Sequence, residues 1–174
     1  MELAAFFGLQ DPMRVVFAPN ATAALNIAIS SIKGHIVCSA AEHNSVLRPV
    51  YRQGNYTIVP CDELGRITVE NIESAIRPDT EAVILSHASN VTGNVIDLEA
   101  VGELCASRGI HFIVDASQSA GLLPLQMKNI SALCFTGHKS LFGPQGTGGL
   151  VLGENFLPSA LVVGGSGHHS FSHD

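Results

Sequence analysis

Short apolar runs that alternate with helical patterns constrain the fold of this chain more than any other feature. Residues 22–31, 45–53, 69–76 and 97–107 carry apolar side chains at helical spacing. The strand-like runs before, between and after them are RVVFA, HIVCSA, YTIVPC, EAVILSH, HFIVDA, ALCFTG and GLVLG. Such alternation is typical of an α/β sheet, and near-continuous apolar strands indicate a sheet that is covered on both faces.

The sequence therefore predicts a three-layer α/β fold with a mostly parallel, seven-stranded sheet and helices on both faces. Only a glycine-rich loop joins the last two runs, which is too short for a parallel crossover, so GLVLG is expected to run antiparallel. The 174 residues are 46% hydrophobic, enough for the core of one domain. Residues 164–174 change to Gly, Ser and His, as is typical of an exposed end.

Charge and composition exclude several classes of function. The net charge is -6, with nine Lys plus Arg and no basic run, so we expect no nucleic-acid partner. No apolar run approaches the roughly 18 residues that cross a bilayer, so we expect no membrane partner and a cytoplasmic protein. Cys38, Cys61, Cys105 and Cys134 lack CxxC spacing, and we interpret them as reduced core thiols.

Polar residues follow the predicted strands RVVFA, HIVCSA and EAVILSH. In open α/β sheets, ligands bind at the carboxyl ends of such strands. Thr22 opens a helix whose free backbone N–H groups suit a phosphate, although an ordinary helix cap gives the same pattern. His43 can stack on a flat ligand, move protons or bond its own turn. Asn90 lies in the turn SHASNVTGN, where asparagine also occurs for backbone reasons.

The later strands end in a carboxylate and an amine. Asp115 ends HFIVDA, with Gln118 shortly after it, and a buried carboxylate there needs a cation, either a metal or a protonated ring nitrogen. Lys139 lies in FTGHKSLFGPQGTGGL among mostly uncharged neighbours. Burial there would favour the neutral amine, which can attack a carbonyl. Alternatively, the side chain extends its ammonium group to water.

One ligand, pyridoxal 5'-phosphate, carries groups for all of these positions. Its phosphate suits Thr22, its flat ring suits His43, its ring cation suits Asp115, and its aldehyde suits Lys139. The sequence thus predicts pyridoxal 5'-phosphate as the cofactor. A glycine-rich dinucleotide fingerprint is absent, which argues against NAD.

Four motifs in order resemble those of a known family: AEHNSVLRP, SHASNVTGNV, VDASQSAG and FTGHKSLFGPQGTGGL. They are similar to the cysteine desulfurase family of the class V aminotransferases, which are pyridoxal-phosphate enzymes of fold type I. The resemblance covers nearly the whole chain. It implies a lyase or transferase that converts cysteine to alanine with sulfur transfer, or acts on a related amino acid. It also implies a small amino-acid substrate, a homodimer and a sulfur-acceptor protein.

The resemblance further implies roles for individual residues. Lys139 and His43 would be catalytic, as the Schiff-base lysine and the ring-stacking histidine. Asp115 would pair with the pyridine nitrogen, Gln118 with the phenolic oxygen, and Asn90 would face both cofactor and substrate. The phosphate would be held by Thr22, Ala23, Thr136, His138 and Ser166, the last of them reaching the phosphate of the partner subunit.

The chain also departs from the family. Asn20 stands where the family usually has glycine in the phosphate turn. Family chains are much longer, so we expect residues 1–163 to form an incomplete cofactor-binding large domain and 164–174 a tail, without the small C-terminal domain. That domain carries the substrate-binding arginine and the sulfur-accepting cysteine. A truncated, catalytically silent module that binds cofactor or dimerises is therefore the alternative. Metal binding by the tail histidines is a third hypothesis: His168, His169 and His173.

Overall fold

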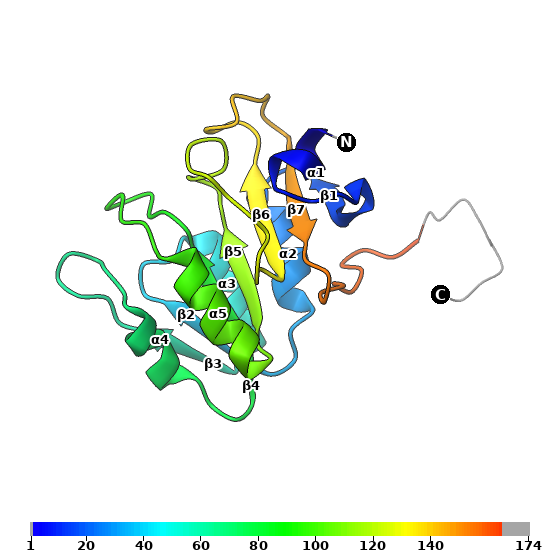
Figure 1. Ribbon diagram of the computed structural model, residues 1–174. Coiled ribbons are helices and arrows are strands. Elements are labelled where there is room, and N and C mark those ends of the chain that lie inside the picture. The colour runs from blue at the N-terminus through cyan, green and yellow to red at the C-terminus, as the bar shows by residue number, and fades with distance from the viewer. Residues whose placement is uncertain (1, 165–174) are drawn as a thin grey trace.

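The computed structural model describes residues 2–164 of the chain. Seven strands form one mixed sheet in the order β1-β7-β6-β5-β4-β2-β3 (Figure 1). Each predicted run overlaps one of them, and the starts agree to within one residue: β1 Val15–Ala18, β2 His35–Ser39, β3 Tyr56–Val59, β4 Thr80–Ser86, β5 His111–Asp115, β6 Ala132–Thr136 and β7 Gly148–Leu152. The predicted seven-stranded α/β sheet is confirmed.

Strand β7 runs antiparallel to both of its neighbours, β6 and β1. The pairs formed among β2, β3, β4, β5 and β6 are all parallel. This confirms the antiparallel direction that the short glycine-rich loop predicted. All strands except β7 therefore end at the same edge of the sheet, which we call the carboxyl edge.

The four predicted helices form, and their ends agree with the predicted ranges to within one residue. They are α2 Ala21–Ser30, α3 Asn44–Gln53, α4 Val69–Ala75 and α5 Leu98–Arg108. Two short elements were not predicted: helix α1, Glu2–Phe6, and the 3-10 helix η1, Pro12–Arg14. Each is too short to show a helical period in the sequence.

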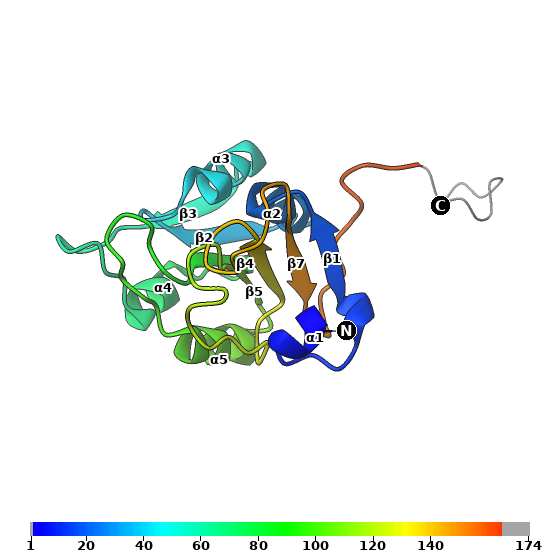
Figure 2. The same cartoon turned by 90° about the horizontal axis from the view of Figure 1, so that it is seen from above.

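Helices cover both faces of the sheet (Figure 2). Helices α2 and α3 lie on one face, and α1, α4 and α5 lie on the other. In β2, Ile36 and Cys38 belong to the core beneath α2 and α3, whereas Val37 belongs to the opposite core. Because successive side chains of a strand point to opposite faces, the consecutive apolar residues at the centre of β2 fit a sheet buried on both sides.

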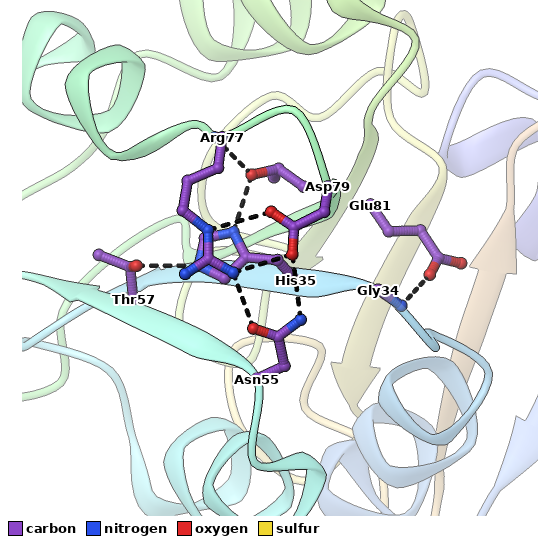
Figure 3. Close-up of polar contacts among 8 residues, drawn as sticks. Gly34, His35, Asn55, Thr57, Arg77, Asp79 and Glu81 are labelled. Carbon is purple, nitrogen blue, oxygen red and sulfur yellow. Dashed lines mark hydrogen bonds and ion pairs between the residues drawn. The ribbon is translucent and has the colours of Figure 1, made fainter.

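A polar cluster closes the edge of the sheet opposite to the carboxyl edge (Figure 3). His35 is fully buried there, with Nδ1 2.8 Å from Thr80 Oγ1 and Nε2 2.8 Å from Thr57 Oγ1. Thr80 Oγ1 also accepts the backbone N–H of Arg77, at 2.8 Å. Burial and the Arg77 charge lower the pKa of His35 by more than the Asp79 carboxylate raises it, which favours a neutral ring.

No helix within residues 2–164 has the length and apolar character needed to span a membrane.

Candidate active site

A cavity of about 200 Å³ opens at the carboxyl edge of the sheet. Its walls come from the turns that follow β1, β2, β4, β5 and β6. Eight of the predicted site residues line it: Thr22, His43, Asn90, Asp115, Gln118, Thr136, His138 and Lys139. Ala23 does not line the cavity, and Ser166 lies outside the described residues. The fold thus brings residues from five separate segments to one place.

Asp115 supplies a buried carboxylate at the end of β5. It is 4% exposed, and its Oδ1 accepts hydrogen bonds from the backbone N–H of Ser117, at 2.9 Å, and from Ser117 Oγ. None of the ion pairs formed within residues 2–164 includes Asp115. A buried carboxylate without a cationic partner is costly, so a cationic ligand group in the cavity would stabilise it.

Lys139 is exposed, as in the alternative in which its side chain extends to water. The reason lies in the backbone: β6 ends at Thr136 and the chain then leaves the sheet in a loop. That loop is held by bonds from the Gly143 N–H to the Gly137 carbonyl, at 2.7 Å, and from the Phe142 N–H to the Lys139 carbonyl, at 2.9 Å. The Lys139 amine forms no ion pair with any residue in the described part of the chain. It is therefore free to react with a ligand in the cavity.

His43 is oriented by the residue that follows it in the next helix. It is the N-cap of α3, and its Nδ1 accepts the backbone N–H of Ser45 at 3.1 Å. Because a backbone N–H can only donate, Nδ1 is the unprotonated ring nitrogen and Nε2 carries the proton. Ser45 Oγ lies 2.9 Å from Nδ1 and 2.7 Å from Thr22 Oγ1. Sequence reasoning missed Ser45, and no pattern indicated it, because histidine is not among the residues that usually cap helices.

In the phosphate turn, a helix cap occupies the backbone N–H of Ala23. Helix α2 begins at Ala21, and the side chain of Asn20 caps it by accepting the Ala23 N–H at 2.9 Å. The Ala23 N–H is thus already bonded, and Asn20, the residue that replaces the family's glycine, is the cause. The Ala21 and Thr22 N–H groups remain among the first donors of the helix, which have no partner within it.

Two further polar groups lie on the side of β6. Thr136 Oγ1 is 3.0 Å from His138 Nδ1, and Thr136 is buried whereas His138 is exposed. Together with the Thr22 hydroxyl, they place hydrogen-bonding groups from two segments at the cavity. Hydroxyl and imidazole groups beside a helix start suit an anion.

Glu42 is a buried carboxyl beside the cavity that sequence reasoning missed. It is 7% exposed and directly precedes His43. Burial raises the pKa of Glu42 to about 7, and the Asp115 charge also raises it, against hydrogen bonds from Ser39 and Ser86 that lower it. The motif AEHN gave no signal for this residue, because glutamate before a helix is ordinarily solvated.

The four cysteines are free thiols, and none lines the cavity. Cys38, Cys105 and Cys134 are buried, as predicted for core thiols, whereas Cys61 is half-buried after β3. Burial raises the pKa of Cys38 and of Cys105 to about 12. These two therefore stay protonated at neutral pH.

No group of three metal-ligating side chains occurs within residues 2–164. The tail histidines of the metal hypothesis lie beyond that range: His168, His169 and His173.

Comparisons with known proteins agree with the motifs. Residues 1–173 match the family model described as aminotransferase class-V. Cysteine desulfurase IscS of Pectobacterium carotovorum subsp. carotovorum (strain PC1) is 40% identical over 153 residues, which is 80% of this chain and 38% of that protein. Cysteine desulfurase IscS of Shewanella pealeana (strain ATCC 700345 / ANG-SQ1) is 40% identical over 171 residues, 89% of this chain and 42% of that protein. The chain thus spans about two fifths of the length of these relatives.

Solved structures give the same result. SspA in complex with cysteine superposes with a TM-score of 0.87 at 29% identity, over 93% of this chain and 50% of SspA. DndA from Streptomyces lividans has a TM-score of 0.87 at 28% identity, over 94% of this chain and 51% of DndA. Sequence and fold thus agree, and the chain belongs to the class V aminotransferase family, with cysteine desulfurases among its relatives.

Proposed function

We propose that this chain binds pyridoxal 5'-phosphate in the cavity at the carboxyl edge and uses it on a small amino acid, as a cysteine desulfurase does. The observation that carries the proposal is the convergence of Thr22, His43, Asp115 and Lys139, from four separate strand ends, on one cavity. Family membership supports it.

The residues present fit each part of this cofactor. Asp115 is a buried carboxylate without a cationic partner among the described residues, and a protonated ring nitrogen would supply the missing charge. The Thr22 and Thr136 hydroxyls and the start of α2 suit the phosphate. The unpaired Lys139 amine suits the aldehyde. No described residue that lines the cavity opposes this arrangement.

When bound, the cofactor withdraws electrons from the α-carbon of an amino acid. Asp115 would hold a proton on the ring nitrogen by its negative charge. Lys139 Nζ would hold the aldehyde and, as a free amine, would be the base that moves protons at the α-carbon. His43, with its proton on Nε2, would lie against the ring and orient it.

Cysteine is the amino acid that we favour as substrate. Relatives at 40% identity are named cysteine desulfurases, and the SspA structure contains cysteine. Conversion of cysteine to alanine transfers sulfur to a thiol, and none of the four cysteines of this chain lines the cavity. We therefore place the acceptor thiol outside residues 2–164, on a further segment or on a partner protein.

We further propose that the active form is a cytoplasmic homodimer in which Ser166 reaches the cofactor phosphate of the partner subunit. Large apolar side chains near the site residues support a second subunit. Phe142, Val91 and Leu122 are 94%, 84% and 71% exposed and follow Lys139, Asn90 and Gln118 closely in the sequence. Exposed apolar residues around a polar cavity are typical of a surface that another chain covers.

Cofactor titration followed by absorption spectroscopy tests the proposal. We expect the purified chain to become yellow with pyridoxal 5'-phosphate and to retain the colour through gel filtration, and we expect Lys139→Ala to lose it. A colourless wild-type chain would contradict the proposal. A yellow chain that leaves cysteine unchanged even together with added acceptor protein would instead support the alternative of a catalytically silent cofactor-binding module.

A further inference from the structure

Glu42 joins the ends of two strands beside the cavity. Its Oε1 accepts a hydrogen bond from Ser39 Oγ, at the end of β2, over 2.5 Å. Its Oε2 accepts two hydrogen bonds from Ser86, at the end of β4, one from the backbone N–H and one from Oγ, both 2.7 Å long. One buried carboxyl group thus holds β2 against β4.

Ser86 needs this partner because β2 ends too early to supply one. The next residue, His87, donates its N–H to the Asp115 carbonyl of β5 at 3.0 Å. Successive N–H groups of a strand point to opposite sides, so the Ser86 N–H points toward β2. Strand β2 ends at Ser39, and the Glu42 carboxylate occupies the position where a further strand residue would offer a carbonyl.

Ser86 connects this contact to the chemistry of the site. It lines the cavity and is the register partner of Asp115 on the adjacent strand. On its other side, Glu42 directly precedes His43, which caps α3 and lines the same cavity. Glu42 therefore contacts two parts of the site. It directly precedes His43, proposed to orient the cofactor ring, and it binds the strand next to Asp115, proposed to pair with the ring nitrogen.

We propose that Glu42 is a positioning residue of the cofactor site, which fixes the end of β4 beside Asp115 and the turn that carries His43. The inference rests on the proposed function of the cavity. Truncation of Glu42 would leave the Ser86 N–H without its acceptor and free the turn before His43. His43 and Asp115, the two residues proposed to contact the cofactor ring, would then no longer be held at a fixed distance from each other.

Glu81 provides a matched control at the other end of β4 (Figure 3). Its Oε2 accepts the backbone N–H of Lys33 at 2.8 Å and the backbone N–H of Gly34. Each glutamate thus accepts backbone N–H groups next to one end of β4. Glu42 binds Ser86, which lines the cavity, whereas Glu81 binds Lys33 and Gly34, which do not. Substitution of Glu81 therefore measures how the loss of a carboxylate at a strand end affects stability, while the cofactor site stays intact.

The test compares Glu42→Ala, Glu42→Gln and Glu81→Ala with the wild type. The first measurement is amide hydrogen exchange of Ser86 in the cofactor-free chain. The second is the affinity for pyridoxal 5'-phosphate, together with the circular dichroism of the bound cofactor per mole bound. The cofactor signal reports the orientation of the ring, which general stability does not change.

We expect Glu42→Ala to speed Ser86 exchange, to weaken cofactor binding about tenfold and to reduce the cofactor dichroism. Glu42→Gln should restore most of both properties, because its amide oxygen can still accept from Ser86. Glu81→Ala should leave both properties at wild-type values. If Glu42→Ala does not fold, Glu42→Asp, one methylene too short to reach both strands, takes its place with the same expected losses.

Equal cofactor affinity and equal dichroism in Glu42→Ala and Glu81→Ala would overturn the positioning role, even if the two variants lose stability equally. A wild-type chain without any bound-cofactor signal would overturn the proposed function and this inference with it. The two failures are thus distinguishable.

Discussion

The hydroxyl oxygens of Thr22 and Ser45 lie 2.7 Å apart, although the two residues belong to different helices. Ser45 Oγ is also 2.9 Å from His43 Nδ1. A residue at the start of α2, proposed to hold the phosphate, is therefore linked to the ring proposed to lie on the cofactor. The hydroxyl of Ser45 therefore connects the proposed phosphate site to the proposed ring site, and its removal should affect cofactor binding.

Replacement of Ser45 by alanine should weaken cofactor binding by about threefold to tenfold. The backbone N–H of Ala at this position still orients the His43 ring, but the hydroxyl bridge to Thr22 is lost. Titration with pyridoxal 5'-phosphate measures the effect. Ser30→Ala is the control, because Ser30 Oγ donates to the Ile27 carbonyl at the far end of α2, away from the cavity. Equal affinity in both variants would show that the bridge has no role in binding.

Replacement of Asp115 by asparagine should reduce protonation of the ring nitrogen more than it reduces cofactor binding. An amide can bond to the ring nitrogen but cannot hold a proton there by charge. Nitrogen NMR of bound, ring-labelled cofactor measures the protonated fraction. The cofactor-free variant should be at least as stable as wild type. In wild type, the carboxylate of Asp115 is buried without a cationic partner among the described residues, and asparagine removes that cost. An unchanged nitrogen resonance in the variant would argue against the assigned role of Asp115.

The pKa of Glu42 predicts how stability depends on pH. Burial raises this pKa from 4.5 to about 7, so the folded chain retains a proton that the unfolded chain has released. The resulting stabilisation is complete below pH 4.5 and is lost as the pH rises through 7. Over this interval the loss amounts to about 3 kcal/mol.

Glu42→Gln does not titrate, so its unfolding free energy relative to wild type should increase from pH 5 to pH 8, by up to about 3 kcal/mol. Urea unfolding at the two pH values measures this difference. Glu81→Gln controls for the loss of a strand-end carboxylate elsewhere in the sheet. A difference between Glu42→Gln and wild type that is the same at both pH values would contradict the raised pKa.

The strands could be predicted from the sequence because each is a continuous apolar run, and burial on both faces follows from that. Contacts between distant segments could not. Two of the hydrogen bonds to Glu42 come from Ser86, 44 residues away, which no local pattern indicates. The sequence left burial and exposure of Lys139 both open, because the choice depends on where the backbone leaves the sheet. At Ala23, the sequence could not distinguish a helix cap by Asn20 from a phosphate contact, because both use the same backbone N–H.

The chain alone should release little sulfide from cysteine. Desulfuration needs a thiolate that can approach the substrate, and none of the four cysteines lines the cavity. Two of them, Cys38 and Cys105, stay protonated because burial raises the pKa of each to about 12. Sulfide and alanine are measured with saturating cofactor and a reductant. Turnover near one per second, which is ordinary for enzymes, would contradict this expectation.

Borohydride reduction of the cofactor-loaded chain, followed by peptide mapping, tests the central claim most directly. Reduction makes the bond between amine and cofactor permanent, so the labelled peptide identifies the lysine that holds it. We predict label on Lys139 alone, and none in a Lys139→Ala chain whose far-ultraviolet circular dichroism equals that of wild type. Label on Lys33 or Lys128, or a wild-type chain without label, would contradict the claim.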